Sequence, residues 1–156
     1  MLFWGIQALG YEDRPFLPAV IARGRKYPLY DVTVTIADME NIHAKQEEIR
    51  QKWGTLDDPV FESYKQLESL KETHIIGTFV PPRNVLLGPY PLPDNSDNRG
   101  YEIRITARNG FIAQQIHFLK VDGKWVMAEK IFKGPKAEVI QQFFDPQFPR
   151  NKWGSW

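Results

Sequence analysis

Apolar and polar residues alternate most regularly over residues 29–39, "LYDVTVTIADM". β-Branched and aromatic side chains hold every second position of this run, and polar or small residues lie between them. A period of two residues predicts a strand with one buried face. Strong helix formers follow, and Asp58 with Pro59 then suits the N-cap and first turn of a second helix. Residues 40–71 are therefore predicted to be a two-helix insertion that lies over a sheet.

Strand-like patterns return after this insertion. Residues 74–80 resemble a strand, and a Pro-rich connection follows over 81–100, which suits a loop or a sheet edge because proline has no N–H to donate. Three further strands are predicted at 101–108, 111–121 and 124–132. The last segment, 134–156, is predicted to form a short helix at about 136–144 and an aromatic tail.

Two turn dipeptides predict the register of the last three strands. Asn109-Gly110 favours a two-residue type I′ loop, which places Glu102 opposite His117. One face of this hairpin is then almost wholly apolar, and the other is wet. The apolar face comprises Tyr101, Ile103, Ile105, Ala107, Ile112, Ile116 and Phe118, and the wet face carries Glu102, Arg104, Gln115 and His117.

Two polar residues fall on the apolar face. The register of the Asp122-Gly123 turn places Glu129 opposite Ile116. A β-bulge near Met127–Ala128 that reverses the phase is the favoured explanation, and an inward-pointing carboxylate is the alternative. Gln114 either hydrogen-bonds to backbone at a sheet edge or interface, or lines a pocket.

Composition and charge narrow the classes of function. The 156 residues fit one domain, and 42% hydrophobic with 25% charged residues is typical of a soluble globular protein. Twenty basic residues against nineteen acidic ones give a net charge of +1, without a basic footprint for nucleic acid. The lack of cysteine excludes a disulfide framework and a thiol nucleophile. Without an apolar span or a signal-peptide pattern, we expect a soluble protein and favour the cytoplasm.

Groups that could support catalysis or bind a metal each have a simpler structural explanation. His43 and Glu47 have the i,i+4 spacing of two ligands on one helix face, with Glu40 one turn earlier, but such residues are common on polar helix surfaces. A Glu102–His117 pair would suit acid–base chemistry, yet it is also an ordinary cross-strand surface pair. Nucleotide-binding and serine-nucleophile motifs do not occur. We therefore expect no metal and no cofactor, and we favour a non-enzymatic role.

Aromatic residues gather at both ends of the chain. They are Phe3, Trp4, Tyr11, Phe143, Phe144, Phe148, Trp153 and Trp156. Termini that fold back on the core would account for the phenylalanines. Trp153 and Trp156 suit an exposed binding or oligomer surface equally well.

The strand "YPLYDVTVTIADM", the helical stretch after it and the hairpins "RNGFIAQQIHFLKVDGKWVMAEKIFK" together resemble an immunoglobulin-like β-sandwich domain of uncharacterised bacterial proteins. In that family the domain often follows membrane-spanning or coiled-coil segments. The resemblance covers roughly residues 17–133 and implies a fold without an activity. Membrane association would require segments absent from this chain.

The "VDGKW" turn also resembles the closing hairpin of the nuclear-transport-factor-2-like α+β cone. In that fold two helices precede a curved sheet around a pocket, an order that residues 40–132 match loosely. The strand at 29–39, ahead of the helices, favours the sandwich.

We therefore predict a single mainly-β domain over residues 1–156, with its core at about 16–133. The predicted architecture is an immunoglobulin-like antiparallel sandwich with the two-helix insertion and a short C-terminal helix. The predicted function is a non-enzymatic binding or assembly module for a protein partner or a second copy. The candidate contact residues are Arg104, Gln115, His117, Trp153 and Trp156. The alternative is a small-ligand-binding or acid–base enzyme domain, which a cavity of about 300 Å³ or more beside Gln114 and Glu129 would favour and a filled core would exclude.

Overall fold

The computed structural model describes residues 3–9, 17–23, 28–53, 61–80, 84–88, 90, 92, 95–108 and 110–155. Within these ranges the protein is mainly β, which confirms the predicted fold class. Both helices of the predicted insertion are present between two neighbouring strands of the larger sheet. The relation to the immunoglobulin-like family stays a prediction.

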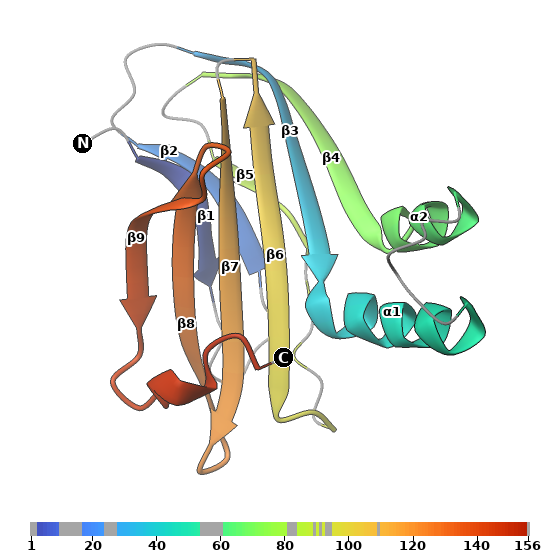
Figure 1. Cartoon of the computed structure of the whole chain (residues 1–156). Helices are drawn as coiled ribbons and strands as arrows, with labels where there is room; N and C mark the ends of the chain where they lie inside the picture. The colour runs from blue at the N-terminus through green and yellow to red at the C-terminus, as the bar shows by residue number, and fades with distance from the viewer. Residues whose placement is uncertain are drawn as a thin grey trace.

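The larger sheet has six antiparallel strands in the order β4-β3-β6-β7-β8-β9 (Figure 1). Its strands are β3 (Leu29–Asp38), β4 (Lys71–Phe79), β6 (Asn98–Ala107), β7 (Gly110–Val121), β8 (Lys124–Lys133) and β9 (Glu138–Phe144). The smaller sheet has the order β1-β2-β5 and comprises β1 (Phe3–Leu9), β2 (Leu17–Arg23) and β5 (Asn84–Leu86). The helices are α1 (Met39–Trp53), α2 (Phe61–Glu68) and the short 3₁₀ helix η1 (Arg150–Lys152).

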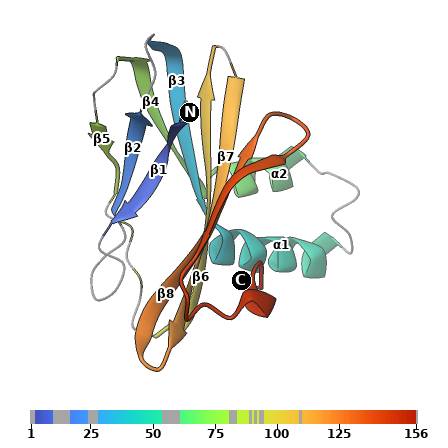
Figure 2. The ribbon, with the colours of Figure 1, turned by 90° about the vertical axis from the view of Figure 1, so that its left-hand side faces the viewer.

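Alternation along the strands gives the larger sheet an inner and an outer face. The inner face carries the main hydrophobic core, and the smaller sheet lies on that side, while the helices project from the other (Figure 2). Burial of this apolar surface is the main favourable term in folding. The core residues are Leu29, Val32, Val34, Ile36, Phe79, Leu87, Tyr101, Ile103, Ile105, Ala107, Ile112, Ile116, Phe118, Trp125, Met127 and Ile131.

Helix α1 begins directly at the end of β3, where Asp38 caps it. The Asp38 Oδ1 accepts hydrogen bonds from the backbone N–H groups of Glu40 (3.1 Å) and Asn41 (3.3 Å), which would otherwise lack intrahelical partners. Arg99 on β6 forms ion pairs with both Asp38 and Glu40. This contact ties the first turn of the helix to the sheet.

The C-terminal helix predicted at 136–144 is wrong, because most of this segment forms the edge strand β9. The edge of β8 was available for pairing, and β9 hydrogen-bonds along it from Ala128 to Lys133. A turn at residues 134–137 reverses the chain, with positive φ angles at Gly134 (67°) and Ala137 (50°). β-Branched and aromatic residues in β9 fit a pleated surface better than a short helix.

The register predicted from the Asp122-Gly123 turn is confirmed, since Val121 pairs with Lys124. Asp122 and Gly123 have φ angles of 49° and 79°, as a type I′ turn requires. The bulge predicted near Met127–Ala128 is wrong, because the β7–β8 ladder has no register shift. Glu129 therefore points inward, on the side of the core.

The register predicted from Asn109-Gly110 is wrong by two positions. Ala107 pairs with Gly110, so that Glu102 lies opposite Gln115 and not opposite His117. Arg108 is held outside the hairpin because its N–H donates to the Tyr30 carbonyl at 3.0 Å. A shift of two residues keeps every side chain on its predicted face, because the side-chain period in a strand is two.

Candidate functional site

The outer face of the larger sheet contains most of the residues that the sequence marked for contact. Two cross-strand rows cross its centre: Arg104, Ala113 and Phe132 in one, and Glu102, Gln115 and Lys130 in the next. His117 and Ala128 form the row after these. The face divides at Gln115 and Lys130 into a covered half, around His117, and an open half, around Arg104.

The C-terminal segment, residues 145–155, lies over the covered half (Figure 1). Its first N–H, from Asp145, donates to the Met127 carbonyl at 2.9 Å. Phe148 is only 4% exposed and packs edge-on against the His117 ring, with 5.1 Å between ring centroids. With Val126 and Ala128 it forms a second hydrophobic cluster, on the side of the sheet opposite the main core.

Polar contacts hold the same segment in place. The Asn98 Nδ2 donates to the Ser155 carbonyl at 2.7 Å, and the His117 Nε2 lies 2.6 Å from the Asn98 Oδ1. Because the Asn98 amide nitrogen is the donor to Ser155, its Oδ1 is the acceptor. The neutral His117 ring therefore carries its proton on Nε2.

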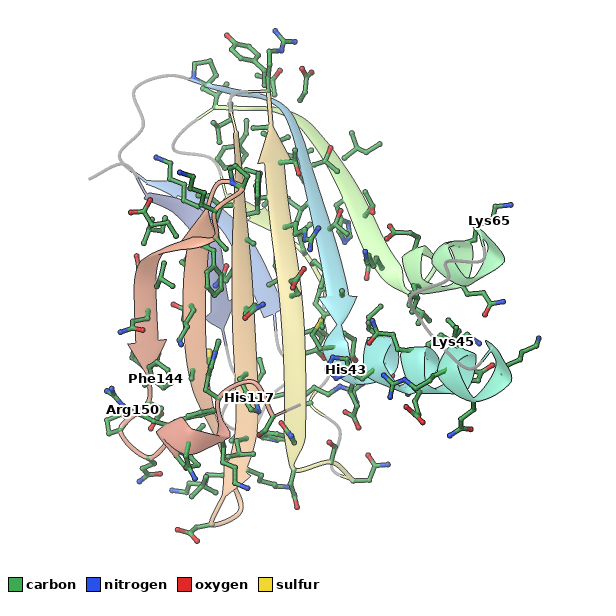
Figure 3. The ribbon with its side chains drawn as sticks, viewed as in Figure 1. His43, Lys45, Lys65, His117, Phe144 and Arg150 are labelled. Atoms are coloured by element: carbon green, nitrogen blue, oxygen red, sulfur yellow. The ribbon has the colours of Figure 1, made fainter. Side chains whose placement is uncertain are left out.

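His117 is fully buried, so the prediction that it lies on a wet surface is wrong. Burial lowers the pKa of His117 to about 4, because desolvation penalises the imidazolium form. Figure 3 shows His117 on the sheet between Phe144 and Arg150 on one side and His43 of α1 on the other. The residues that cover His117 follow it by about 30 positions, and alternation along β7 contains no sign of them.

The open half holds a cavity of about 280 Å³. Glu102 connects the polar groups of this cavity. The Glu102 Oε1 pairs with the Arg104 Nε at 2.8 Å, and the Glu102 Oε2 accepts a longer hydrogen bond of 3.4 Å from the Gln115 Nε2. The turn between β8 and β9 forms one rim. The lining residues are Glu102, Arg104, Phe111, Ala113, Gln115, Phe132, Gly134, Pro135 and Ala137.

This cavity combines an ion pair with an apolar floor. The Arg104 side chain is 60% exposed, whereas that of Glu102 is 21% exposed. Their charges cancel, and Phe111, Ala113 and Phe132 supply apolar surface beside them. Such a mixture of apolar lining and few polar groups is typical of a binding site.

Gln114 and Glu129, the two polar residues predicted on the apolar face, lie together on the inner face of the sheet. The Gln114 Nε2 donates to the Glu129 Oε2 at 2.8 Å, and Gln114 is fully buried. Burial raises the pKa of Glu129, and the hydrogen bond from Gln114 lowers it by a smaller amount. The cavity of the open half is on the other face of the sheet, so it does not involve this pair.

A third polar cluster involves the edge strand β4. The His74 Nε2 lies 2.8 Å from the Glu72 Oε1 and 3.1 Å from the Tyr90 hydroxyl. Burial, and next the hydrogen bond with Glu72, raise the pKa of Tyr90. Tyr90 therefore stays protonated and acts as a hydrogen-bond donor.

The helix residues considered as metal ligands have other partners. Glu40 pairs with Arg99, and Glu47 pairs with Arg50 at 2.9 Å. Within the described ranges, no group of three or more His, Asp or Glu side chains is arranged to hold a metal ion.

Of the two predicted contact tryptophans, Trp153 packs in the covered half. Its ring lies 6.1 Å from that of His117, and the Lys130 ammonium lies 4.9 Å from its centroid. Trp156 is outside the described residues, as are Asp58 and the side chains of Phe3, Trp4 and Tyr11.

Sequence reasoning missed several residues of the outer face. Phe111, Ala113 and Phe132 alternate in phase with Gln115 and Lys130, so the strand pattern contained a signal for them. The role of Asn98 had no local signal, because its contact with Ser155 joins residues far apart in the chain.

No known protein family, no curated protein and no solved structure matches this chain. In the part of the chain that the structure describes, no helix is both long and apolar enough to cross a membrane. The geometry of the outer face is therefore the basis for a functional proposal.

Proposed function

We propose that this protein is a non-enzymatic binding or assembly module and that its partner contacts the open half of the outer face. The observation that supports this most directly is the cavity of about 280 Å³ in which Arg104 and Gln115 meet apolar side chains. Both residues were marked as contact residues by the strand pattern. The resemblance to an immunoglobulin-like domain, in which sheets, edges and loops present contact surfaces, supports the same class of function.

The polar groups of the cavity favour binding over catalysis. Arg104 and Gln115 occupy the two oxygens of Glu102, an arrangement that orients side chains for contact. Arginine and aromatic residues are also enriched where proteins meet. A protein partner or a second copy is the partner class that we propose, and bacterial origin and cytoplasmic location stay predictions.

Photo-cross-linking from two positions tests this proposal. The photoreactive residue p-benzoylphenylalanine would replace Gln115 in one full-length variant and Glu47, on the exposed surface of α1, in the other. Both variants would be irradiated in an extract of the cells that produce the protein, and products would be identified by mass spectrometry. We expect a discrete adduct from position 115 that is absent from position 47 and that Arg104→Ala weakens. Equal labelling from both positions would contradict the proposal.

A second candidate function is a small-ligand or acid–base site at Gln114 and Glu129. The observation that favours it is the part-buried hydrogen bond of 2.8 Å from the buried Gln114 to a carboxyl group whose pKa is raised. The dye 8-anilinonaphthalene-1-sulfonate tests for an apolar site there. Saturable binding that Glu129→Leu abolishes would support this candidate, and the lack of saturable binding would remove it.

A further inference from the structure

The covered half of the outer face already binds a peptide, namely the C-terminal segment of the same chain. Phe148 supplies an aromatic side chain that packs on His117. Asn98 donates its side-chain amide to the main-chain carbonyl of Ser155 at 2.7 Å, and Lys130 lies over the Trp153 ring. This half therefore holds a segment of turns and one short 3₁₀ helix through the backbone and the aromatic side chains of that segment.

The open half continues the same track along β7. The outer-face positions of the open half on β7 are Gln115, Ala113 and Phe111. At about 3.4 Å per residue the distance from Gln115 to Phe111 is roughly 14 Å, the length of about four residues of extended peptide. A segment seated here would lie end to end with the C-terminal segment, with Lys130 beside both.

The ion pair of the open half places a hydrogen-bond donor beside an acceptor, as the C=O and N–H of a peptide amide require. The Arg104 Nε is engaged with Glu102, which leaves the two Nη groups as donors to a carbonyl oxygen. The Glu102 carboxylate beside it accepts one hydrogen bond at each oxygen, and the second lone pair of each oxygen can accept from an N–H group. Since the two charges cancel, a neutral amide fits the pair better than a free carboxylate or an ammonium group does.

We infer that the open half binds an extended peptide segment. Arg104 and Glu102 hydrogen-bond to one main-chain amide of this segment, and Phe111 and Phe132 pack against one of its apolar or aromatic side chains. This inference rests on the proposed binding function and names the chemistry of the partner.

Three small probes with the same aromatic body test the inference: phenylacetamide, phenylacetate and phenethylamine. Each would be titrated into the ¹⁵N-labelled full-length protein while amide resonances are recorded by NMR. We expect saturable shifts at Phe111, Gln115, Phe132 and Gly134 with phenylacetamide, at a millimolar dissociation constant typical of so small a ligand. The acid and the amine should bind at least about fivefold more weakly, because each meets a like charge in the pair.

Glu102→Gln provides the sharper test, because it keeps the size of the side chain and removes its charge. Arg104 is then unbalanced, and the preference should reverse in favour of phenylacetate. The matched control is Arg108→Gln, which removes an exposed arginine that pairs with Asp31 at 2.7 Å and does not line the cavity. This control should leave the order of the three probes unchanged.

Several results would overturn the inference: no saturable shift, shifts confined to residues 145–155, or a wild-type preference for the acid or the amine. If cross-linking from position 115 succeeds while the amide preference fails, the binding function stands and the peptide inference is wrong. If cross-linking is equal from both positions, the proposed function itself fails.

Discussion

The covered and open halves of the outer face are built by the same strands, yet their polar side chains have opposite environments. His117 in the covered half is fully buried, and its pKa falls to about 4. Arg104 in the open half has a side chain that is 60% exposed. The difference comes from residues 145–155, which cross one half and leave the other uncovered. A polar strand face therefore becomes a second core or stays exposed to solvent according to what lies over it.

Removal of the aromatic anchor of the covered half should have the largest effect. Phe148→Ala empties the centre of the second cluster and should lower the free energy of unfolding by about 3 kcal/mol. Urea denaturation followed by circular dichroism measures this loss. The control is Phe143→Ala on β9, where Phe143 is 42% exposed, and it should cost less than about 1 kcal/mol. Equal losses would mean that the C-terminal segment does not cover a core.

Acid should weaken the covered half through His117. Its folded pKa of about 4 lies below the ordinary value of 6.5, so between these values the unfolded chain binds the proton more readily. The contribution of His117 is full above pH 6.5, is lost as the pH falls toward 4, and amounts to at most about 3 kcal/mol. Unfolding free energies from pH 7 to pH 4 measure it.

The control for this acid effect is His117→Gln, which keeps a polar side chain and removes the titration. Glu129 contributes with the opposite sign, because a raised folded pKa gives stability that is lost as the pH rises. Since both proteins contain Glu129, the difference between them isolates His117. Parallel pH profiles would contradict the burial of His117.

A substitution in the rim of the open half should stabilise the protein. Ala137 has a φ of 50°, a conformation that costs an L-residue about 1–2 kcal/mol and costs glycine little. Glycine loses more backbone entropy on folding than alanine does, and this loss offsets part of the gain. Ala137→Gly should therefore raise the free energy of unfolding by roughly 0.5 kcal/mol. The same change at Ala44 in α1 should lower it by about 1 kcal/mol. A loss of thermal stability in Ala137→Gly would show that the turn is not strained at this residue.

Loss of the arginine of the open half should have the smallest effect on stability. Arg104→Ala removes an exposed ion pair and should change the free energy of unfolding by less than about 0.5 kcal/mol. Arg99→Ala is the comparison, because Arg99 is largely buried and pairs with Asp38 and Glu40. Thermal denaturation of both variants separates them. A large loss in Arg104→Ala would show that the open half is structural and not a contact surface.

Local periodicity explains which parts of the fold were predictable. The alternation from Val32 to Ile36 in β3 and the Asp122-Gly123 turn are encoded within a few residues, and the structure confirms both. Tyr30, predicted in phase with Val32, is exposed because the β3–β4 ladder shifts register between Leu29 and Val32. β9 was not predictable in the same way, because its residues suit a strand only where the edge of β8 can pair with them. Glu129 was correctly placed by register, and the error lay in expecting a bulge to avoid a buried carboxyl group. Gln114 offsets part of that cost with its hydrogen bond.

The sequence by itself determined the mainly-β class, the helical insertion and the face on which each side chain of the hairpins lies, because these depend on short-range period and turn chemistry. Only the tertiary structure decided which half of the polar face is exposed to solvent. That outcome depends on contacts between distant residues, such as Phe148 with His117 and Asn98 with Ser155. Such contacts join residues that are neighbours only in the folded sheet, and no local pattern records them.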